Sequence, residues 1–153
     1  MTHWRMQVHP GEPSRSVKHA VESLSAGYVG LDFEEDTGDL TTIPKDSLPK
    51  KRLDYWAFAH EMKEGDPVLV IAHHFPLALA RVAGPYNYIR LKAPEIGVWF
   101  RHFRAVDDVR YFADFKTNAK EWSQITMTDT ISPLRDPNSQ SYRLIQEWLA
   151  AHT

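Results

Sequence analysis

The stretch from Glu64 to Tyr88, EGDPVLVIAHHFPLALARVAGPYNY, constrains the fold more than any other part of the chain. A turn sequence at Glu64-Gly65-Asp66 precedes a compact apolar run from Pro67 to Ala72. This run is too short for an ordinary helix and carries the β-branched residues of a buried strand. A second run, Leu77 to Ala83, follows after a short break. Because that break has the length of a hairpin loop, we predict an antiparallel pair of strands.

Further strands are indicated on both sides of this hairpin. Tyr86 and Tyr88 follow the second run at strand spacing, and alternation places both on the same side. Residues 3–8, 27–33 and 99–106 have the alternation or β-branching of strands, and 125–131 is a candidate for one more.

Three segments have the apolar spacing of amphipathic helices, namely 16–25, 51–62 and 140–150. The first ends at Gly27, where glycine can take the left-handed conformation that closes helices. In the second, the spacing puts Leu53, Trp56, Ala57 and His60 on one face. We expect the three helices to pack against the predicted strands through Leu24, Leu53 and Ile145.

The composition is that of one globular domain over residues 1–153. Hydrophobic residues make up 42% of the chain and charged residues 25%. The chain has no cysteine, which excludes disulfides and thiolate metal sites. The first residues lack the apolar core of a signal peptide, and no run reaches the length of a membrane span. These features predict a cytoplasmic domain without a membrane partner.

The formal net charge is −2, which argues against a protein that coats nucleic acid without specificity. It leaves room for a reader whose basic residues gather on one face. Aromatic residues make up 12% of the chain and include five tryptophans, so some rings are expected at a pocket or a surface.

The motifs of common enzyme classes are missing from the sequence. His73 and His74 are neighbours, and adjacent strand residues point to opposite faces, so they do not form a metal pair. The chain contains no HExxH, GxSxG, GxGxxG or GK[ST] motif. We therefore expect no catalytic residues, no metal site and no cofactor.

The order of these weak motifs resembles that of a known group of small barrels. A helix, then a "GD-V-" strand, then a strand ending in "RVAGPY-Y" is similar to domains of the PUA superfamily, and within it to the EVE-like and YTH-like domains. The resemblance covers roughly residues 3–110. It implies an α+β fold, a mostly antiparallel β-barrel of five or six strands with helices packed outside.

The resemblance also implies a function, because the group includes N-terminal modules of modification-dependent restriction enzymes that read a methylated base in DNA. By this analogy the chain flips a modified base into an aromatic pocket, with N6-methyladenine preferred over 5-methylcytosine. It would then act as a targeting module beside a nuclease or ATPase partner, or a missing effector domain. The alternatives are a small PUA-like enzyme or small-ligand domain, and a reader of modified bases in RNA.

In YTH-like relatives one ring of the cage comes from the strand after the first helix, and another lies before a later strand. The corresponding positions here are Tyr28 or Phe33, and Trp99. The resemblance places the polar group that reads the base edge at Gln7, His9 or Asp32. Trp56 and Tyr88 are further candidate rings. The residues that could contact phosphates are all basic: Lys50, Lys51, Arg52, Arg90, Lys92, Arg101 and Arg104.

Trp99 is the central residue of this predicted site. If 97–106 is a strand, Val98, Phe100 and His102 form its more apolar side and fill the core. Trp99, Arg101 and Phe103 then lie on the side where a base and its phosphates could bind. The competing interpretation is that the Trp99 ring is an ordinary part of the core.

Overall fold

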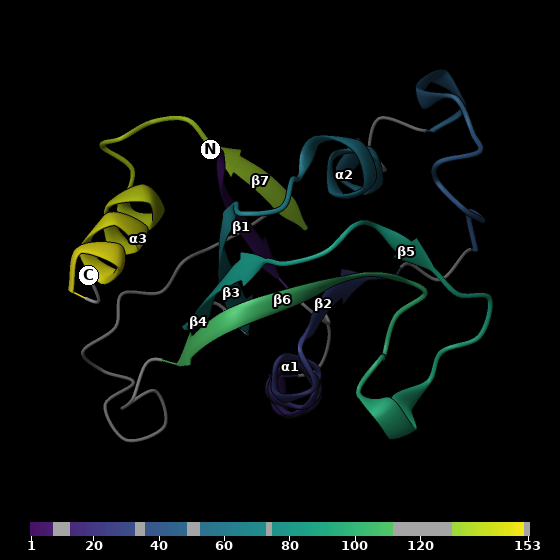
Figure 1. Ribbon diagram of the computed structural model, residues 1–153, viewed down its shortest axis with the longest axis horizontal. Coiled ribbons are helices and arrows are strands. Elements are labelled where there is room, and N and C mark those ends of the chain that lie inside the picture. The colour runs from purple at the N-terminus through teal and green to yellow at the C-terminus, as the bar shows by residue number, and fades with distance from the viewer. Residues whose placement is uncertain (8–12, 33–35, 49–52, 73–74, 112–129, 152–153) are drawn as a thin grey trace.

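The computed structural model describes residues 1–7, 13–32, 36–48, 53–72, 75–111 and 130–151. These residues form a curled mixed sheet with helices packed around it (Figure 1). In chain order the elements are β1 (His3–Gln7), α1 (Pro13–Ala26), β2 (Tyr28–Leu31), η1 (Lys45–Ser47), α2 (Leu53–Trp56), the π-helical turn η3 (Ala57–Glu61), β3 (Pro67–Ala72), β4 (Phe75–Val82), β5 (Asn87–Tyr88), η4 (Pro94–Ile96), β6 (His102–Tyr111), β7 (Ile131–Leu134) and α3 (Gln140–Ala151).

The sheet has the order β2-β6-β4-β3-β1-β7, and the short strand β5 pairs with β6. The β1–β3 pairing is parallel, whereas the other pairings between named strands in the described residues are antiparallel. The expectation of a mostly antiparallel α+β fold is therefore confirmed. Where the resemblance implied a β-barrel, the structure has a half-barrel, because β2 and β7 end the path without pairing in the described part of the chain.

The predicted hairpin is β3 and β4, which pair antiparallel with Val68 opposite Ala80. Gly65 has a φ of +93°, and this left-handed conformation forms the tight turn before β3. The Asp66 carboxylate closes that turn, because it accepts the Lys63 backbone N–H at 3.0 Å and the Trp4 indole N–H at 2.9 Å. The predicted turn thus also fixes β1 beside β3.

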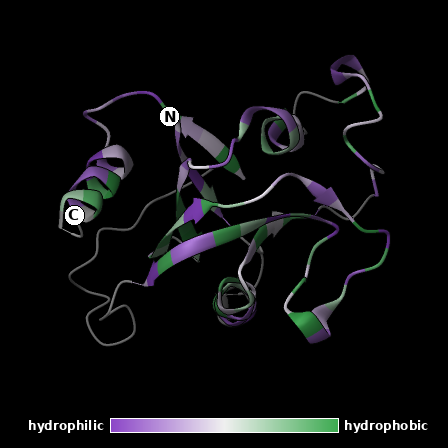
Figure 2. Ribbon diagram, viewed as in Figure 1, coloured by the Kyte–Doolittle hydropathy of each residue, from purple (hydrophilic) through white to green (hydrophobic). Residues whose placement is uncertain are grey.

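Two hydrophobic clusters lie on opposite sides of β3. Val68 and Val70 belong to the main core between the sheet and helices α1 and α2–η3. Leu69 and Ile71 face the other way and pack with Ile145 of α3, which is fully buried. Figure 2 shows that α3 carries both hydrophilic and hydrophobic residues, as a helix with one covered side does.

Helix α1 closely follows its prediction. Leu24 is buried against the sheet, and Gly27 ends the helix with a φ of +88°. Ile145 is also buried as expected, but Leu53 is 39% exposed, so its predicted role in packing is wrong. Residues 53–62 contain two stripes of apolar residues with helical spacing. The stripe that is buried contains Tyr55, Phe58, Ala59 and Met62.

Arg104 does not make the phosphate contact that was predicted for it. Its side chain is buried, and its guanidinium donates to the carbonyl oxygens of Phe58 at 2.9 Å, Ala59 at 3.1 Å and Gly84 at 3.0 Å. Two of these carbonyls belong to the last turn of the α2–η3 helix, whose terminal carbonyls have no helical partner. Arg104 therefore caps this helix from β6 and is not available to a phosphate.

No helix in the described ranges is both long enough and apolar enough to cross a membrane.

We predict that Arg104→Met lowers the free energy of unfolding by about 3–5 kcal/mol, because it leaves buried carbonyls without donors while keeping most of the side-chain volume. Chemical denaturation measures this loss. Arg81→Met is the matched control, because the Arg81 side chain is 49% exposed and its ion pair with Asp108 spans 3.8 Å. We expect about 0.5 kcal/mol or less for it. Equal losses in the two variants would contradict the capping role of Arg104.

Candidate functional site

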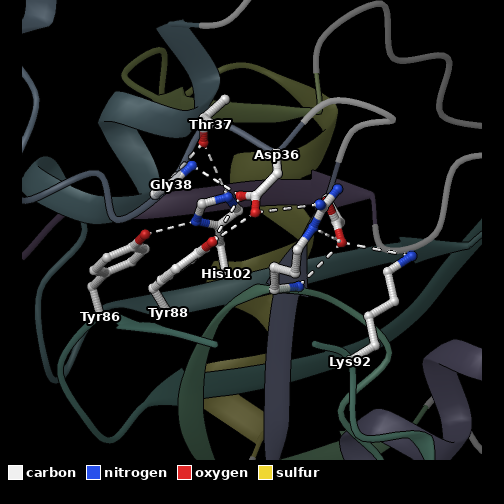
Figure 3. Close-up of polar contacts among 9 residues, drawn as sticks. Asp36, Thr37, Gly38, Tyr86, Tyr88, Lys92 and His102 are labelled. Carbon is white, nitrogen blue, oxygen red and sulfur yellow. Dashed lines mark hydrogen bonds and ion pairs between the residues drawn. The ribbon is translucent and has the colours of Figure 1, made fainter. Parts of the chain in front are cut away.

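Aromatic and charged side chains gather where β2 ends and β6 begins. We call this group the tyrosine–histidine cluster; by its contacts it consists of Asp32, Asp36, Thr37, Tyr86, Tyr88, Lys92, Arg101 and His102. Figure 3 shows its polar contacts. The segment after β2 supplies the acidic residues, β5 and its flanks supply the tyrosines and the lysine, and the start of β6 supplies the arginine and the histidine. Residues far apart in the sequence thus meet at one end of the half-barrel.

His102 is at the centre of the cluster and is fully buried. Its Nδ1 lies 2.6 Å from the Tyr86 hydroxyl, and its Nε2 lies 3.2 Å from Thr37 Oγ1. The Tyr86 hydroxyl already accepts the Leu40 backbone N–H at 3.2 Å, so its own proton is directed to Nδ1. The Nε2–H of His102 then donates to Thr37, whose hydroxyl donates to the Gly38 carbonyl. This chain of donors and acceptors assigns the neutral Nε2–H tautomer.

Burial determines the protonation of this pair. It lowers the pKa of His102 from 6.5 to about 4, because the cation would lose its hydration, and nearby carboxylates offset only part of this. Burial likewise raises the pKa of the Tyr86 hydroxyl. At neutral pH both groups are therefore uncharged, which agrees with the hydrogen bonds they make.

Three tyrosine rings surround the imidazole. The ring of Tyr55 lies 4.7 Å from that of His102 at 60°, Tyr86 lies at 5.9 Å and 22°, and Tyr88 lies at 5.3 Å and 39°. Tyr55 is buried, whereas Tyr86 and Tyr88 are half-buried. Tyr86 and Tyr88 reach the same imidazole, so the prediction that they share one side is confirmed.

A charged layer covers the aromatic group. The Arg101 guanidinium donates to the Asp32 carboxylate from Nε at 3.0 Å and from Nη2 at 2.7 Å. Lys92 Nζ lies 3.6 Å from the same carboxylate. The Tyr88 hydroxyl donates to the Asp36 carboxylate and lies 2.8 Å from each of its oxygens. Arg101 Nη1 lies 3.7 Å from the same carboxylate. The layer therefore joins a ring, two carboxylates and two cations.

The two carboxylates differ in their access to a ligand. The Asp32 side chain is 6% exposed and that of Asp36 is 35% exposed. The Gly38 backbone N–H and the Tyr88 hydroxyl hold the pKa of the Asp36 carboxyl below its usual value. Asp36 is thus ionised at neutral pH and can accept hydrogen bonds from a ligand.

Four residues of the predicted site meet in this cluster. Asp32 and Tyr88 were assigned to the base, and Lys92 and Arg101 to phosphates. Their contacts connect a carboxylate that can accept hydrogen bonds, an aromatic ring and two positive charges. Arg101 is turned toward Asp32, with its side chain 17% exposed, so its first role is to hold that carboxylate.

Other predicted residues have different surroundings. The Trp99 ring stacks on His19 of α1 at 3.8 Å, and its indole N–H donates to Glu22 at 2.9 Å. The Tyr28 ring meets Phe103 edge-on at 5.5 Å. Trp56 stacks on His60 at 3.8 Å, Gln7 is the last residue of β1, and Arg90 is exposed after β5. The predicted residues His9, Phe33, Lys50, Lys51 and Arg52 lie outside the described residues.

The alternation predicted around Trp99 holds for burial, since Val98, Phe100 and His102 are all buried. The strand itself begins only at His102, and Trp99 lies in the segment that leads into it.

His102, Tyr86, Asp36 and Thr37 were not predicted from the sequence to be members of a site. Some signals were present. The acidic sequence EEDTGD at 34–39 contains Asp36 two residues before Gly38, and the Asp36 carboxylate accepts the Gly38 N–H at 2.9 Å in a turn typical of aspartate. A histidine on the apolar side of a strand was a second signal, because a buried imidazole needs hydrogen-bond partners.

Within the described residues, no group of three or more His, Asp or Glu side chains is arranged to hold a metal ion. Comparison with models of known protein families and with curated proteins finds no match to this chain.

The burial of His102 makes stability depend on pH. As the pH falls from 6.5 toward 4, the unfolded chain takes up the proton before the folded chain, so the folded state loses stability in that window. The full contribution is present above pH 6.5, and its loss amounts to about 3 kcal/mol at most. We predict an NMR titration of the His102 ring near pH 4 and a flatter dependence of unfolding free energy on pH in His102→Gln.

His3→Gln is the comparison variant, because burial also lowers the pKa of His3. Its removal should flatten the slope too, so the two variants measure the contributions of the two histidines one at a time. A His102 ring that titrates at pH 6.5 or above would contradict the buried neutral state.

Proposed function

We propose that this chain binds DNA that carries a methylated base, N6-methyladenine in preference to 5-methylcytosine, and holds the flipped base at the tyrosine–histidine cluster. The observation that supports the proposal is the convergence of Tyr88, Asp36 and Lys92 at one end of the half-barrel. The curled mixed sheet with outer helices agrees with a PUA-like fold, which is part of the same proposal.

The cluster offers what a flipped base needs. Stacking on an aromatic ring is worth ~1–3 kcal/mol per base, and extrusion costs a few kcal/mol. Burial of the added methyl returns about 0.8 kcal/mol. Tyr88 supplies a half-buried ring whose position is fixed by Asp36. A ring held in place loses little entropy when a base stacks on it.

The base edge would be read by a carboxylate. N6-methyladenine keeps one N–H on its amino nitrogen, and an ionised aspartate can only accept. Asp36 is the more exposed of the two carboxylates, and it retains acceptor capacity beside its bonds to Tyr88 and Gly38. Asp32 would act indirectly, because it holds the Arg101 guanidinium in place.

Phosphates would meet Arg90 and Lys92. Arg90 is exposed and the Lys92 side chain is 50% exposed, so both can reach a backbone at the rim of the cluster. A chain with a net charge of −2 offers little general attraction to DNA, which favours selectivity over tight binding to any duplex. A nuclease or ATPase partner in the cytoplasm would then supply the effector step.

A small-ligand domain is the second candidate, and a different region supports it. A cavity of about 390 Å³ lies beside β1 and β7 and is lined in part by His3, Trp4, Glu61, Arg135 and Tyr142. Its volume falls in the range of small-molecule sites.

A modified base in RNA would bind at the tyrosine–histidine cluster, as a modified base in DNA would.

We predict that a duplex with one N6-methyladenine binds about 1–3 kcal/mol more tightly than its unmodified twin, since the methyl adds little area and the flipping cost is shared. Fluorescence anisotropy with methylated, unmodified and 5-methylcytosine duplexes, and with RNA of the same sequence, measures the difference. Equal affinity for all of them would overturn the proposal and leave the small-ligand domain.

A pair of ring variants tests where the base binds. Tyr88→Ala should cost ~1–3 kcal/mol of binding to methylated DNA with little loss of stability, because its ring is half-buried at a short edge strand. Trp99→Ala should cost about 2–4 kcal/mol of stability, because it loses the His19 stack and the bond to Glu22. Its binding should persist in the folded fraction. Lost binding with unchanged melting in Trp99→Ala would move the site to Trp99.

A further inference from the structure

The segment between β5 and β6 carries an exposed apolar side chain beside the tyrosine–histidine cluster. Leu91 is 81% exposed, the highest exposure among the large hydrophobic side chains described after Met1. Exposed Arg90 precedes it, and Lys92, whose side chain is 50% exposed, follows it. Figure 2 shows hydrophilic and hydrophobic residues in alternation along this segment.

The segment is fixed on both sides of Leu91. Before it, the Ile89 backbone N–H donates to the Arg101 carbonyl at 2.9 Å. After it, Ala93 and Val98 exchange backbone hydrogen bonds at 2.9 and 3.1 Å. Lys92 Nζ also lies 3.6 Å from Asp32. Leu91 therefore projects from a short bend between two anchored points.

The base of the segment rests on α1. Gly97 has a φ of +84°, and a Cβ at this position would lie 2.4 Å from the Ala26 Cβ. This close approach holds the return of the segment against the helix. The hydrophobic exposure of Leu91 is thus built into an ordered part of the chain.

We propose that Leu91 is a wedge that enters the DNA duplex and occupies the gap left by the flipped base, an inference that rests on the proposed function. Leucine is among the side chains that proteins insert between base steps. Arg90 and Lys92 would hold the phosphates on either side of the insertion. Lys92 links the wedge to the cluster through Asp32, so the emptied stack and the bound base lie next to each other.

This chemistry selects a duplex as the partner. A wedge stabilises a base that has left a stack, whereas an unpaired strand has no stack to refill. Leu91 should therefore matter for a modified base in duplex DNA and not for the same base in a single strand.

The test compares two probes that share one sequence, a duplex with a central N6-methyladenine and the corresponding single strand. We expect Leu91→Ala to weaken duplex binding about tenfold or more and to leave single-strand binding unchanged. Leu91→Phe, which keeps an insertable side chain, should restore duplex binding. A 2-aminopurine beside the methylated base should brighten with the wild-type protein and less with Leu91→Ala.

Ile96→Ala is the matched control, because Ile96 is 60% exposed in the same segment but follows Glu95 and has no flanking cations. It should bind both probes as the wild type does. If Leu91→Ala binds the duplex normally, or weakens both probes equally, the wedge is wrong while methyl selectivity of the wild type still supports the proposed function. If the wild type does not distinguish methylated from plain DNA, the proposed function fails and the wedge with it.

Discussion

The structure depends on strand β3, both faces of which are buried. β3 buries Val68 and Val70 in the main core and Leu69 and Ile71 in the second cluster. Such a strand is stable only inside a sheet that is covered on both sides. The hairpin supplies β4 on one edge, so the other edge must pair with a segment from elsewhere, which is β1. The outer face needs its own cover, and Ile145 of α3 provides it.

The two backbones approach closely where β2 pairs with β6. A Cβ on Gly30 would lie 2.1 Å from Phe100 Cδ2 and 2.3 Å from the His102 carbonyl oxygen, so only glycine allows β2 to pair with β6 there. Phe100 then fills the core under the strand pair, and the next inward residue is His102. The imidazole is therefore placed by core packing, and its burial requires the hydrogen bonds that Tyr86, before β5, and Thr37, after β2, supply.

Features that local sequence patterns determine could be predicted from the sequence. The hairpin follows from two apolar runs and a turn, and the end of α1 follows from Gly27. The face of the α2–η3 helix was assigned incorrectly because 53–60 and 55–62 both have helical spacing, and only packing against β6 decides between them. Arg104 was assigned to phosphates for a similar reason. Its three carbonyl partners come from segments 20 to 46 residues away, which no local pattern reveals.

In the proposed function, the charge arrangement of the cluster makes Arg101 a support for Asp32 more than a contact to DNA. Release of Arg101 to a phosphate would leave the Asp32 carboxylate, 6% exposed, without its main partner. A buried carboxylate without a partner is strongly destabilising, so a phosphate gains little from that arginine. Exposed Arg90 can bind a phosphate without this penalty. Lys92 would weaken only a contact of 3.6 Å with Asp32. Binding would therefore draw its charge contacts from the rim and its selectivity from the ring and the carboxylate of Asp36.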